Sequence, residues 1–393
     1  MKRPLRVFLC CQQSLKRHPV PEYRFWAGYF REGLAEAGHS FVEAATCDWA
    51  EGLLPLDDAA RSTWLDRTWQ IAIDAIREEH TRRPVDLFLA YLFPGQVSAA
   101  ALGEVRALGI PSVNFFCDNV REFREVPRAF AGFDLHWVPE YKAVSLYERA
   151  NLPFLHAPMP CFVPPAWRVP VAEEPLAVTF VGTADEQRLA LFAAAADLGL
   201  DVELRGTGWS GHDAPAAPPR RETHSIAATL ANQVAFAQRQ GLGALARKLA
   251  QSMRRPKALA HDFGPSSKPA PDGDDYWKVL RGSRVCIGVS RYPSLRYPFS
   301  RPDTYSRLRD IEAPMAGACY LTEWTEGLGD LYDLGSEIET YASASELVEK
   351  AQELEGDAPR RLGMRTAAQR RALADHSIGR TMEKMASRLN LGG

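Results

Sequence analysis

Short apolar runs alternate with stretches of helical periodicity through the first 160 residues. The predicted strands cover 6–11, 39–45, 85–92, 111–118, 133–139 and 154–160, and the predicted helices cover 24–38, 63–80 and 97–109. Most of these strands are apolar on both faces, which is typical of parallel sheets covered by helices on each side. Because crossovers between parallel strands are right-handed, the pattern predicts a doubly wound α/β domain.

A proline-rich stretch without periodicity, 159–175, interrupts this pattern and is interpreted as a linker. Beyond it the alternation restarts. The predicted strands cover 176–182, 200–206, 284–290 and 318–323, and the predicted helices cover 185–199, 274–283, 343–356 and the start of "EAPMAGACYL" from Glu312. Two Rossmann-like domains in tandem are therefore expected, 1–165 and 166–376, followed by a terminal helix, 377–393, that crosses back to the first domain.

The second domain is interrupted between about 211 and 274 by an insert. Its ends, 211–221 and 264–275, are rich in proline, glycine and polar residues and are predicted to be loops. Between them, 226–259 is helical in pattern, with leucines on one face and several arginines and lysines nearby. Such a helix is a candidate for peripheral contact with an anionic membrane surface, and the alternative is that its apolar stripe packs on the protein itself.

Composition narrows the class of protein. Hydrophobic residues make up 46% and charged residues 24% of the 393 residues, which is ordinary for a globular protein. A net charge of -2 argues against a dedicated nucleic-acid binder. The seven cysteines form no CxxC pair and are predicted to be buried, reduced thiols. No apolar stretch is long enough to span a membrane, so a cytoplasmic protein is expected.

Two stretches of the second domain are candidates for binding an anionic ligand. After the strand 176–182, Gly182 and Thr183 lead directly into a helix with Asp185 as its predicted N-cap and Arg188 in its first turn. Free N–H groups at a helix start favour an anion, although a tight turn with a solvated arginine remains the alternative.

Arg309 and Glu312 lie where the segment after strand 284–290 enters the next helix. An arginine offers a planar fork to phosphate oxygens, and a carboxylate can accept both ribose hydroxyls. The alternative interpretation is an Arg–Glu pair that stabilises the start of the helix.

In the first domain, the chemistry-bearing candidates follow two predicted strands. Gln13, Ser14 and His18 come after strand 6–11, where they could contact a substrate. Asp118 ends strand 111–118 at the same edge and is the acidic candidate for activating or orienting a substrate hydroxyl. His18 is also explained as an ordinary loop residue.

Taken in order, "VTFVGTADEQRLALF", "YWKVLRGSRVCIGVS", "RLRDIEAPMAGACYLTEWTEGLGDLYDLGSEIETYASASELVEKAQEL" and "ADHSIGRTMEKM" resemble the C-terminal half of CgeB-like, spore-maturation-type glycosyltransferases. The likeness covers most of 176–385, and the first half resembles the acceptor-side domain of the same enzymes more loosely. It implies the GT-B architecture, with two Rossmann-like domains facing a central cleft. It also implies a nucleotide-sugar donor held by the second domain without a metal or other cofactor.

The resemblance assigns roles to single positions. Gly182 and Thr183 match the diphosphate-side loop, Glu312 matches the second acid of the E-x7-E motif, which contacts the ribose, and Arg309 would serve the phosphates. The position of the first acid holds Thr304, with Asp303 beside it, so this chain departs from the motif where the donor sugar is gripped.

A glycosyltransferase of glycan biosynthesis is the predicted function. The resemblance implies transfer from a donor such as a UDP-sugar to an acceptor hydroxyl, with retained anomeric configuration. The acceptor is left open as a glycan, a lipid-linked molecule or a small molecule, and the peripheral contact of the insert would be with the inner membrane face. Two alternatives stand beside it, namely a nucleotide-sugar epimerase of GT-B fold and a non-enzymatic two-domain ligand sensor.

Overall fold

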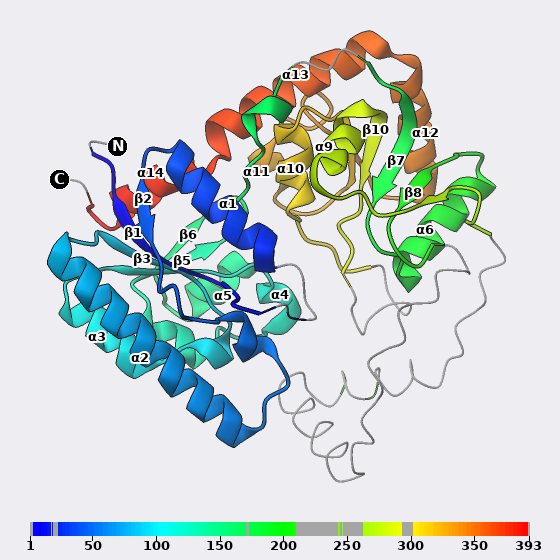
Figure 1. The fold of residues 1–393 in the computed structure, drawn as a ribbon. Helices are drawn as coiled ribbons and strands as arrows, with labels where there is room; N and C mark the ends of the chain where they lie inside the picture. The colour runs from blue at the N-terminus through cyan, green and yellow to red at the C-terminus, as the bar shows by residue number, and fades with distance from the viewer. Residues whose placement is uncertain are drawn as a thin grey trace. The chain divides into compact units, whose positions relative to one another are not determined.

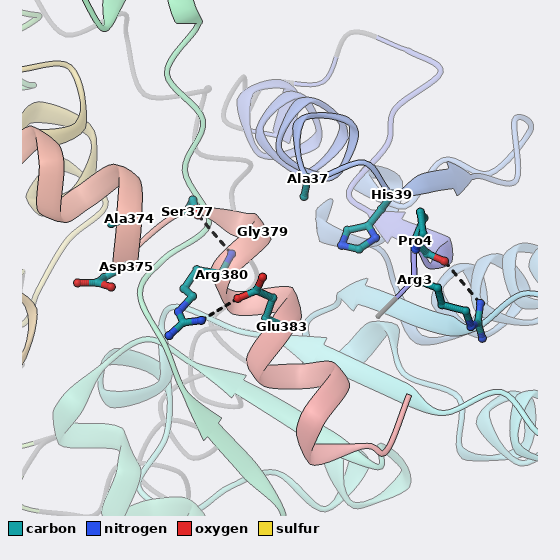
Figure 2. A pocket seen from close by; sticks show the side chains of 10 residues that line it. All are labelled: Arg3, Pro4, Ala37, His39, Ala374, Asp375, Ser377, Gly379, Arg380 and Glu383. Atoms are coloured by element: carbon teal, nitrogen blue, oxygen red, sulfur yellow. Dashed lines mark hydrogen bonds and ion pairs between the residues drawn. The ribbon is translucent and has the colours of Figure 1, made fainter. Parts of the chain in front are cut away.

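The protein is described by a computed structural model. It describes residues 3–16, 18, 23–169, 173–209, 243, 246, 262–292 and 302–391. The chain forms two compact units. The first combines Met1–Phe162 with Ala374–Gly393, and the second is Val163–Leu373 (Figure 1).

The first unit is built around a six-stranded parallel sheet in the order β2-β1-β3-β4-β5-β6. Its strands are β1 (Arg6–Cys11), β2 (Ser40–Val42), β3 (Leu87–Tyr91), β4 (Ser112–Phe115), β5 (Leu135–Val138) and β6 (Phe154–His156). Every residue of β1, β3, β4 and β5 is buried, as their continuous apolar runs predict.

Helices cover both faces of this sheet (Figure 1). They are α1 (Tyr23–Glu36), α2 (Asp58–Arg82), α3 (Ala99–Ala107), α4 (Asn119–Glu122), α5 (Val144–Arg149) and α14 (Ile378–Arg388). Helices α2 and α3 pack together on one face, and α1 packs against α14 on the other. The last helix therefore belongs to the first unit.

The second unit has its own six-stranded parallel sheet, in the order β12-β11-β10-β7-β8-β9. Its strands are β7 (Leu176–Val181), β8 (Glu203–Arg205), β9 (Ser267–Lys268), β10 (Ser283–Gly288), β11 (Tyr320–Glu323) and β12 (Glu339–Tyr341). Its helices are α6 (Glu186–Asp197), α9 (Gly273–Gly282), α10 (Arg309–Met315), α11 (Leu328–Leu331), α12 (Ala344–Gly356) and α13 (Ala358–Asp375), of which α13 runs into the boundary between the units.

The α/β architecture of two Rossmann-like sheets thus matches the sequence prediction, with two differences in detail. The stretch 264–275, predicted to be a loop, contains β9, which pairs with β8 at the edge of the second sheet. Strand β12 was not predicted, and it forms the opposite edge. The basic helical pattern at 226–259 lies outside the described residues, apart from residues 243 and 246.

Candidate functional site

The strand order of each sheet reverses at one point, and doubly wound sheets bind ligands at such a point, beyond the carboxyl ends of the strands. In the second sheet the reversal lies between β7 and β10. Gly182, Thr183 and Arg188 follow β7, whereas Thr304, Arg309 and Glu312 belong to the connection from β10 to β11. The structure therefore places these six predicted residues at the carboxyl edge of one sheet. Gln13, Ser14, His18 and Asp118 belong to the first unit.

The loop after β7 is held by the loop after β8. The Gly182 amide donates to the Arg205 carbonyl at 2.8 Å, and the Trp209 indole Nε1 donates to the Gly182 carbonyl at 2.7 Å. The two backbones approach so closely that a Cβ atom at Gly206 would lie 2.1 Å from the Gly182 oxygen. The position of Gly182 is thus set by its neighbouring strand rather than by its own turn alone.

Helix α6 begins directly behind this loop. The Asp185 side chain accepts hydrogen bonds from the amides of Gln187 and Arg188, both at 2.9 Å, which confirms the predicted N-cap. Arg188 folds back onto the loop, where its Nη1 donates to the Thr183 carbonyl at 2.7 Å and its guanidinium lies 5.5 Å from the Phe180 ring centre. Its buried Nε has no hydrogen-bond partner among the described residues.

Two further arginines lower the pKa of Arg188. Burial lowers the pKa of Arg188, and the positive charges of Arg307 and Arg309 lower it further, which opposes the effect of Asp185. Arg307 donates to the Arg291 carbonyl at 3.0 Å. The Nε and Nη1 atoms of Arg309 are buried and find no hydrogen-bond partner in the described part of the chain. A cluster of partly unsatisfied guanidinium groups is suited to phosphate oxygens.

Glu312 lies beside this arginine cluster, defined as Arg188, Arg307 and Arg309. It is 5% exposed and accepts a hydrogen bond from the Tyr276 hydroxyl at 2.6 Å. Arg309 Nε lies 3.4 Å from the same carboxylate oxygen, and its guanidinium stacks over the Tyr276 ring at 4.9 Å. Burial alone would lower the pKa of Arg309, but Tyr276 and Glu312 raise it, so the guanidinium stays charged.

Asp310 anchors the entrance of α10. Its fully buried carboxylate accepts hydrogen bonds from the Arg307 amide at 2.7 Å, the Ser306 hydroxyl at 3.0 Å and the Tyr320 and Thr322 hydroxyls at 2.8 and 3.1 Å. Burial raises its pKa, and these four donors oppose that rise. Asp310 therefore fixes the backbone that carries Arg307 and Arg309, without being available to a ligand itself.

Four polar residues at this edge were not predicted from the sequence. Arg291 Nε donates to Glu323 Oε1 at 2.8 Å, in a pair that is almost fully buried. Burial raises the pKa of Glu323 and Arg291 opposes the rise. Glu323 Oε2, Ser290 Oγ and Gln187 Oε1 are buried without a hydrogen-bond partner among the described residues. Buried polar atoms are normally satisfied, so these three atoms are candidates for contact with a ligand. The available signal was that Ser290 and Glu323 stand where strands end.

Thr304 joins the same edge through the backbone. It forms an isolated antiparallel bridge with Arg291, and its hydroxyl donates to the Thr325 hydroxyl at 3.2 Å. Thr325 follows the end of β11 by two residues. The position where relatives are expected to carry the first acid is thus packed against the ends of β10 and β11.

In the first unit, the loop after β1 is tied down by its own side chains. Gln13 Oε1 accepts from the Cys11 amide at 2.9 Å, and Gln13 Nε2 donates to Glu43 at 2.5 Å. The Ser14 hydroxyl donates to the Lys16 carbonyl. These contacts give both predicted residues a structural task in the loop.

His18 pairs with a carboxylate that the sequence did not single out. Its Nε2 lies 3.0 Å from Asp48 Oδ2, and both side chains are buried. Asp48 also accepts from the amides of Leu15 and Glu51, at 3.1 and 3.0 Å. A histidine held by a carboxylate is suited to carrying a proton, and this carboxylate also orders the surrounding loops.

Asp118 follows β4 at the same edge of the first sheet. It occupies the N-cap position of the short helix α4 but makes no capping hydrogen bond, and its carboxylate lies 3.8 Å from Arg121. Next to it, the fully buried Glu140 accepts a hydrogen bond from the Asn119 amide at 2.7 Å. Burial raises the pKa of Glu140 to about 8. The sequence offered no signal for Glu140.

In the described part of the chain, no group of three or more His, Cys, Asp or Glu side chains is arranged to hold a metal ion. None of the described helices is both long and apolar enough to cross a membrane. All seven cysteines are free and buried, as predicted.

Three solved structures illustrate the likeness of the fold to known proteins. Sucrose-phosphate synthase from Thermosynechococcus elongatus aligns with a TM-score of 0.57 at 14% identity, over 99% of each chain. AviGT4, a glycosyltransferase of avilamycin A biosynthesis, aligns with 0.54 at 15% identity, also over 99% of each. HepE from Anabaena, solved in complex with UDP, aligns with 0.55 at 12% identity, over 98% of this chain and 99% of that one. At these identities the likeness shows the fold.

Comparison with curated protein sequences finds no match. Comparison with family models does: residues 187–387 match the family described as glycosyl transferase-like. These residues are slightly more than half of the 393-residue chain, and they include Arg188, the segment with Arg309 and Glu312, and all but the last residue of helix α14. The chain belongs to the glycosyl transferase-like family and has the two-sheet GT-B fold.

Proposed function

We propose that this glycosyltransferase moves a sugar from a nucleotide diphosphate sugar, specifically a UDP-sugar, to an acceptor hydroxyl without the help of a metal ion. The observation that carries the proposal is the arginine cluster beside Glu312. Three guanidinium groups and one carboxylate meet at the strand-order reversal of the second sheet. This combination fits a diphosphate joined to a ribose.

The arginine cluster would neutralise the departing diphosphate. Charge builds up on the phosphate oxygens as the glycosidic bond breaks, and fixed cations in a partly buried site stabilise it without reorganising. The first turn of α6, capped by Asp185, adds backbone N–H groups next to Gly182 and Thr183. These groups would do what a divalent cation does in metal-dependent transferases.

Glu312 would hold the ribose. Its carboxylate is already oriented by the Tyr276 hydroxyl and by Arg309. A carboxylate that is already oriented loses little conformational entropy when it binds a ligand. The donor sugar would lie toward Thr304 and Glu323, since Thr304 takes the place of the first acid and the carboxylate of Glu323 has an oxygen without a partner among the described residues.

We assign the acceptor side to the first unit. Asp118, which follows β4 at the carboxyl edge of the first sheet, would orient the acceptor hydroxyl, and His18, held by Asp48, is the second group there that can exchange a proton. The motif order shared with CgeB-like enzymes supports placing the chain in that branch and expecting retained configuration. The acceptor itself, the cytoplasmic setting and the membrane contact of the insert stay predictions from the sequence.

HepE supports the choice of uracil as the nucleobase of the donor. That protein shares this fold and was solved with UDP and with UDP-glucose. We therefore begin the experimental test with UDP and UDP-glucose, and compare them with GDP, ADP and their glucose conjugates.

Thermal unfolding with each nucleotide, in EDTA, tests donor binding, and release of nucleoside diphosphate from the donor sugar tests the chemistry. We expect UDP to raise the melting temperature in EDTA, and UDP-glucose to be hydrolysed slowly or transferred. Absence of a shift with every nucleotide would contradict the proposal.

A pair of variants locates the binding. Arg307→Ala should abolish the shift caused by UDP, because it removes one cation of the cluster. Arg284→Ala is the matched control: it lies in β10 at the opposite end of the strand and is exposed, 3.9 Å from Glu355. Equal loss in both variants would argue against a site at the carboxyl edge.

A further inference from the structure

A carboxylic acid is buried directly behind Asp118. Glu140 stands two residues beyond the end of β5, has no exposed surface, and accepts a hydrogen bond from the Asn119 amide at 2.7 Å. An acid is an expensive residue to bury, since the charged form loses its hydration. A buried acid at the carboxyl edge of the first sheet is a candidate for a role that an apolar residue could not perform.

Asn119 is fixed in three directions. Besides its amide bond to Glu140, its Nδ2 donates to the Phe116 carbonyl at 2.8 Å, and its Oδ1 accepts from the Tyr147 hydroxyl at 2.8 Å. Asn119 and Tyr147 are both fully buried. The residue that follows Asp118 is therefore tied to the end of β4, to the end of β5 and to α5.

This network reaches Asp118 through one peptide bond. Because the peptide unit is planar, holding the Asn119 amide nitrogen also holds the carbonyl and Cα of Asp118. The Asp118 carbonyl accepts from the Glu122 amide at 2.9 Å, so its far side is fixed as well. The Asp118 side chain therefore leaves a backbone whose orientation depends on Glu140.

The charge of Glu140 matters for its neighbour. Burial raises the pKa of Glu140 to about 8, Asp118 adds to the rise, and its hydrogen bonds to Asn119 oppose it. Among the described residues, Asp118 and Tyr147 interact with this carboxyl, and burial raises the pKa of Tyr147. Arg121 lies 3.8 Å from the Asp118 carboxylate on the short helix α4. At neutral pH Glu140 is therefore mostly protonated and adds no second negative charge next to Asp118.

We propose that Glu140 is a positioning residue for sugar transfer: its carboxyl group holds the Asn119 amide and thereby aims the Asp118 carboxylate at the acceptor hydroxyl. The inference rests on the proposed function, which assigns Asp118 to the acceptor. Above pH 8, ionised Glu140 adds a negative charge that interacts unfavourably with Asp118, and we expect this repulsion to disturb the turn that carries Asp118.

The test uses the full-length protein and the donor that releases nucleoside diphosphate fastest in the panel above. Rates are measured from pH 6 to 9.5 for the wild type, Glu140→Ala, Glu140→Gln and Tyr147→Phe, with Glu148→Ala, an exposed glutamate of α5, as the control. Circular dichroism and thermal unfolding establish that each variant is folded. Asp118→Asn is measured alongside.

We expect Glu140→Ala and Tyr147→Phe to lower kcat by about 10- to 100-fold with little change in the KM of the donor, because misaimed catalytic groups cost rate rather than donor binding. Glu140→Gln keeps an acceptor for the Asn119 amide and should restore kcat to within about threefold of wild type at pH 7. The wild-type kcat should fall as pH rises through 8, and the Glu140→Gln profile should stay flat there.

Folded Glu140→Ala and Tyr147→Phe with wild-type kcat would overturn the proposal, as would a Glu140→Gln profile that still falls at pH 8. If Glu140→Ala does not fold, Tyr147→Phe decides. The Asp118→Asn variant separates the two levels of the argument. Full activity in Asp118→Asn would contradict both the assignment of Asp118 to the acceptor and the inference about Glu140. Loss of activity in Asp118→Asn, together with wild-type activity in the Glu140 variants, would contradict only the inference about Glu140.

Discussion

Glu312 is held by two partners of different kinds, the Tyr276 hydroxyl at 2.6 Å and Arg309 Nε at 3.4 Å. The first comes from α9 and the second from the same turn of α10. The sequence could predict the Arg–Glu pair, because the two residues are three positions apart at a helix start. It could not predict the contact with Tyr276, since Tyr276 and Glu312 are distant in sequence and the sheet brings their helices together.

Replacing Glu312 by Ala should weaken UDP binding. The lost bond is between a buried carboxylate and a ligand hydroxyl, which is worth ~1–3 kcal/mol, or a rise in Kd of about 5- to 150-fold. Isothermal titration calorimetry measures it, with Glu349→Ala, an exposed residue of α12, as the control. A Kd unchanged in a folded Glu312→Ala protein would remove the ribose assignment.

Glu140 should make the stability of the protein depend on pH. Its pKa is about 8 in the folded state and near 4.5 when unfolded, so unfolding releases a proton between these values and stability falls as pH rises from 4.5 to 8. The free energy of unfolding of Glu140→Gln relative to wild type should therefore increase across this range, by on the order of 5 kcal/mol at most. Urea unfolding at pH 5, 6.5 and 8 measures the difference, and a constant difference would show that Glu140 titrates normally.

The N-cap of α6 follows directly from local pattern. Asp185 caps this helix because a short acceptor side chain precedes the first helical residue. Glu140 and Asp48 are different. Each is a polar residue in a segment that connects two elements. Only the three-dimensional structure shows that Glu140 is fully buried and that Asp48 pairs with His18.

At the scale of elements, the apolar strands and periodic helices were predictable, and the two short edge strands of the second sheet were not. Strand β9 has two residues, and β12 has three, so neither carries a detectable alternation. They form because the edge of an existing sheet offers unpaired backbone groups. The entrance of α10 is intermediate: its small residues predict close packing, but the four donors to Asp310 come from two separate segments, residues 306–307 and strand β11.

The contact between the loops after β7 and β8 provides an element-scale prediction. Gly206→Ala would place a Cβ atom 2.1 Å from the Gly182 oxygen, so the loop that carries Gly182 and Thr183 must move. We expect a loss of stability of ~1–3 kcal/mol together with weaker UDP binding. Gly363→Ala, in α13 with open space around it, is the matched control and should raise stability by up to about 1 kcal/mol. Thermal unfolding and calorimetry measure both, and an unaffected Gly206→Ala protein would contradict the close approach.

At the scale of the whole molecule, the first unit is discontinuous in sequence. Helix α14 completes it from the far end of the chain, with Ile378, Met382 and Met385 almost fully buried and with Gly33 of α1 so close that a Cβ there would meet Ile378 at 2.3 Å. Burying such side chains contributes about 1.5–3 kcal/mol each.

Removing residues 376–393 should therefore destabilise the first unit selectively. Hydrogen exchange read by peptide should show lost protection in β1, β2 and α1, and retained protection in the strands of the second unit. Equal protection in the first unit with and without α14 would contradict this division of the chain.

The central claim is that the second unit holds a nucleoside diphosphate at the reversal between β7 and β10. A crystal structure with UDP in the absence of divalent metal tests it most directly. We predict diphosphate oxygens within hydrogen-bond distance of the arginine cluster and ribose hydroxyls on Glu312. UDP bound elsewhere on the molecule, or a diphosphate that contacts none of the three arginines, would contradict the account.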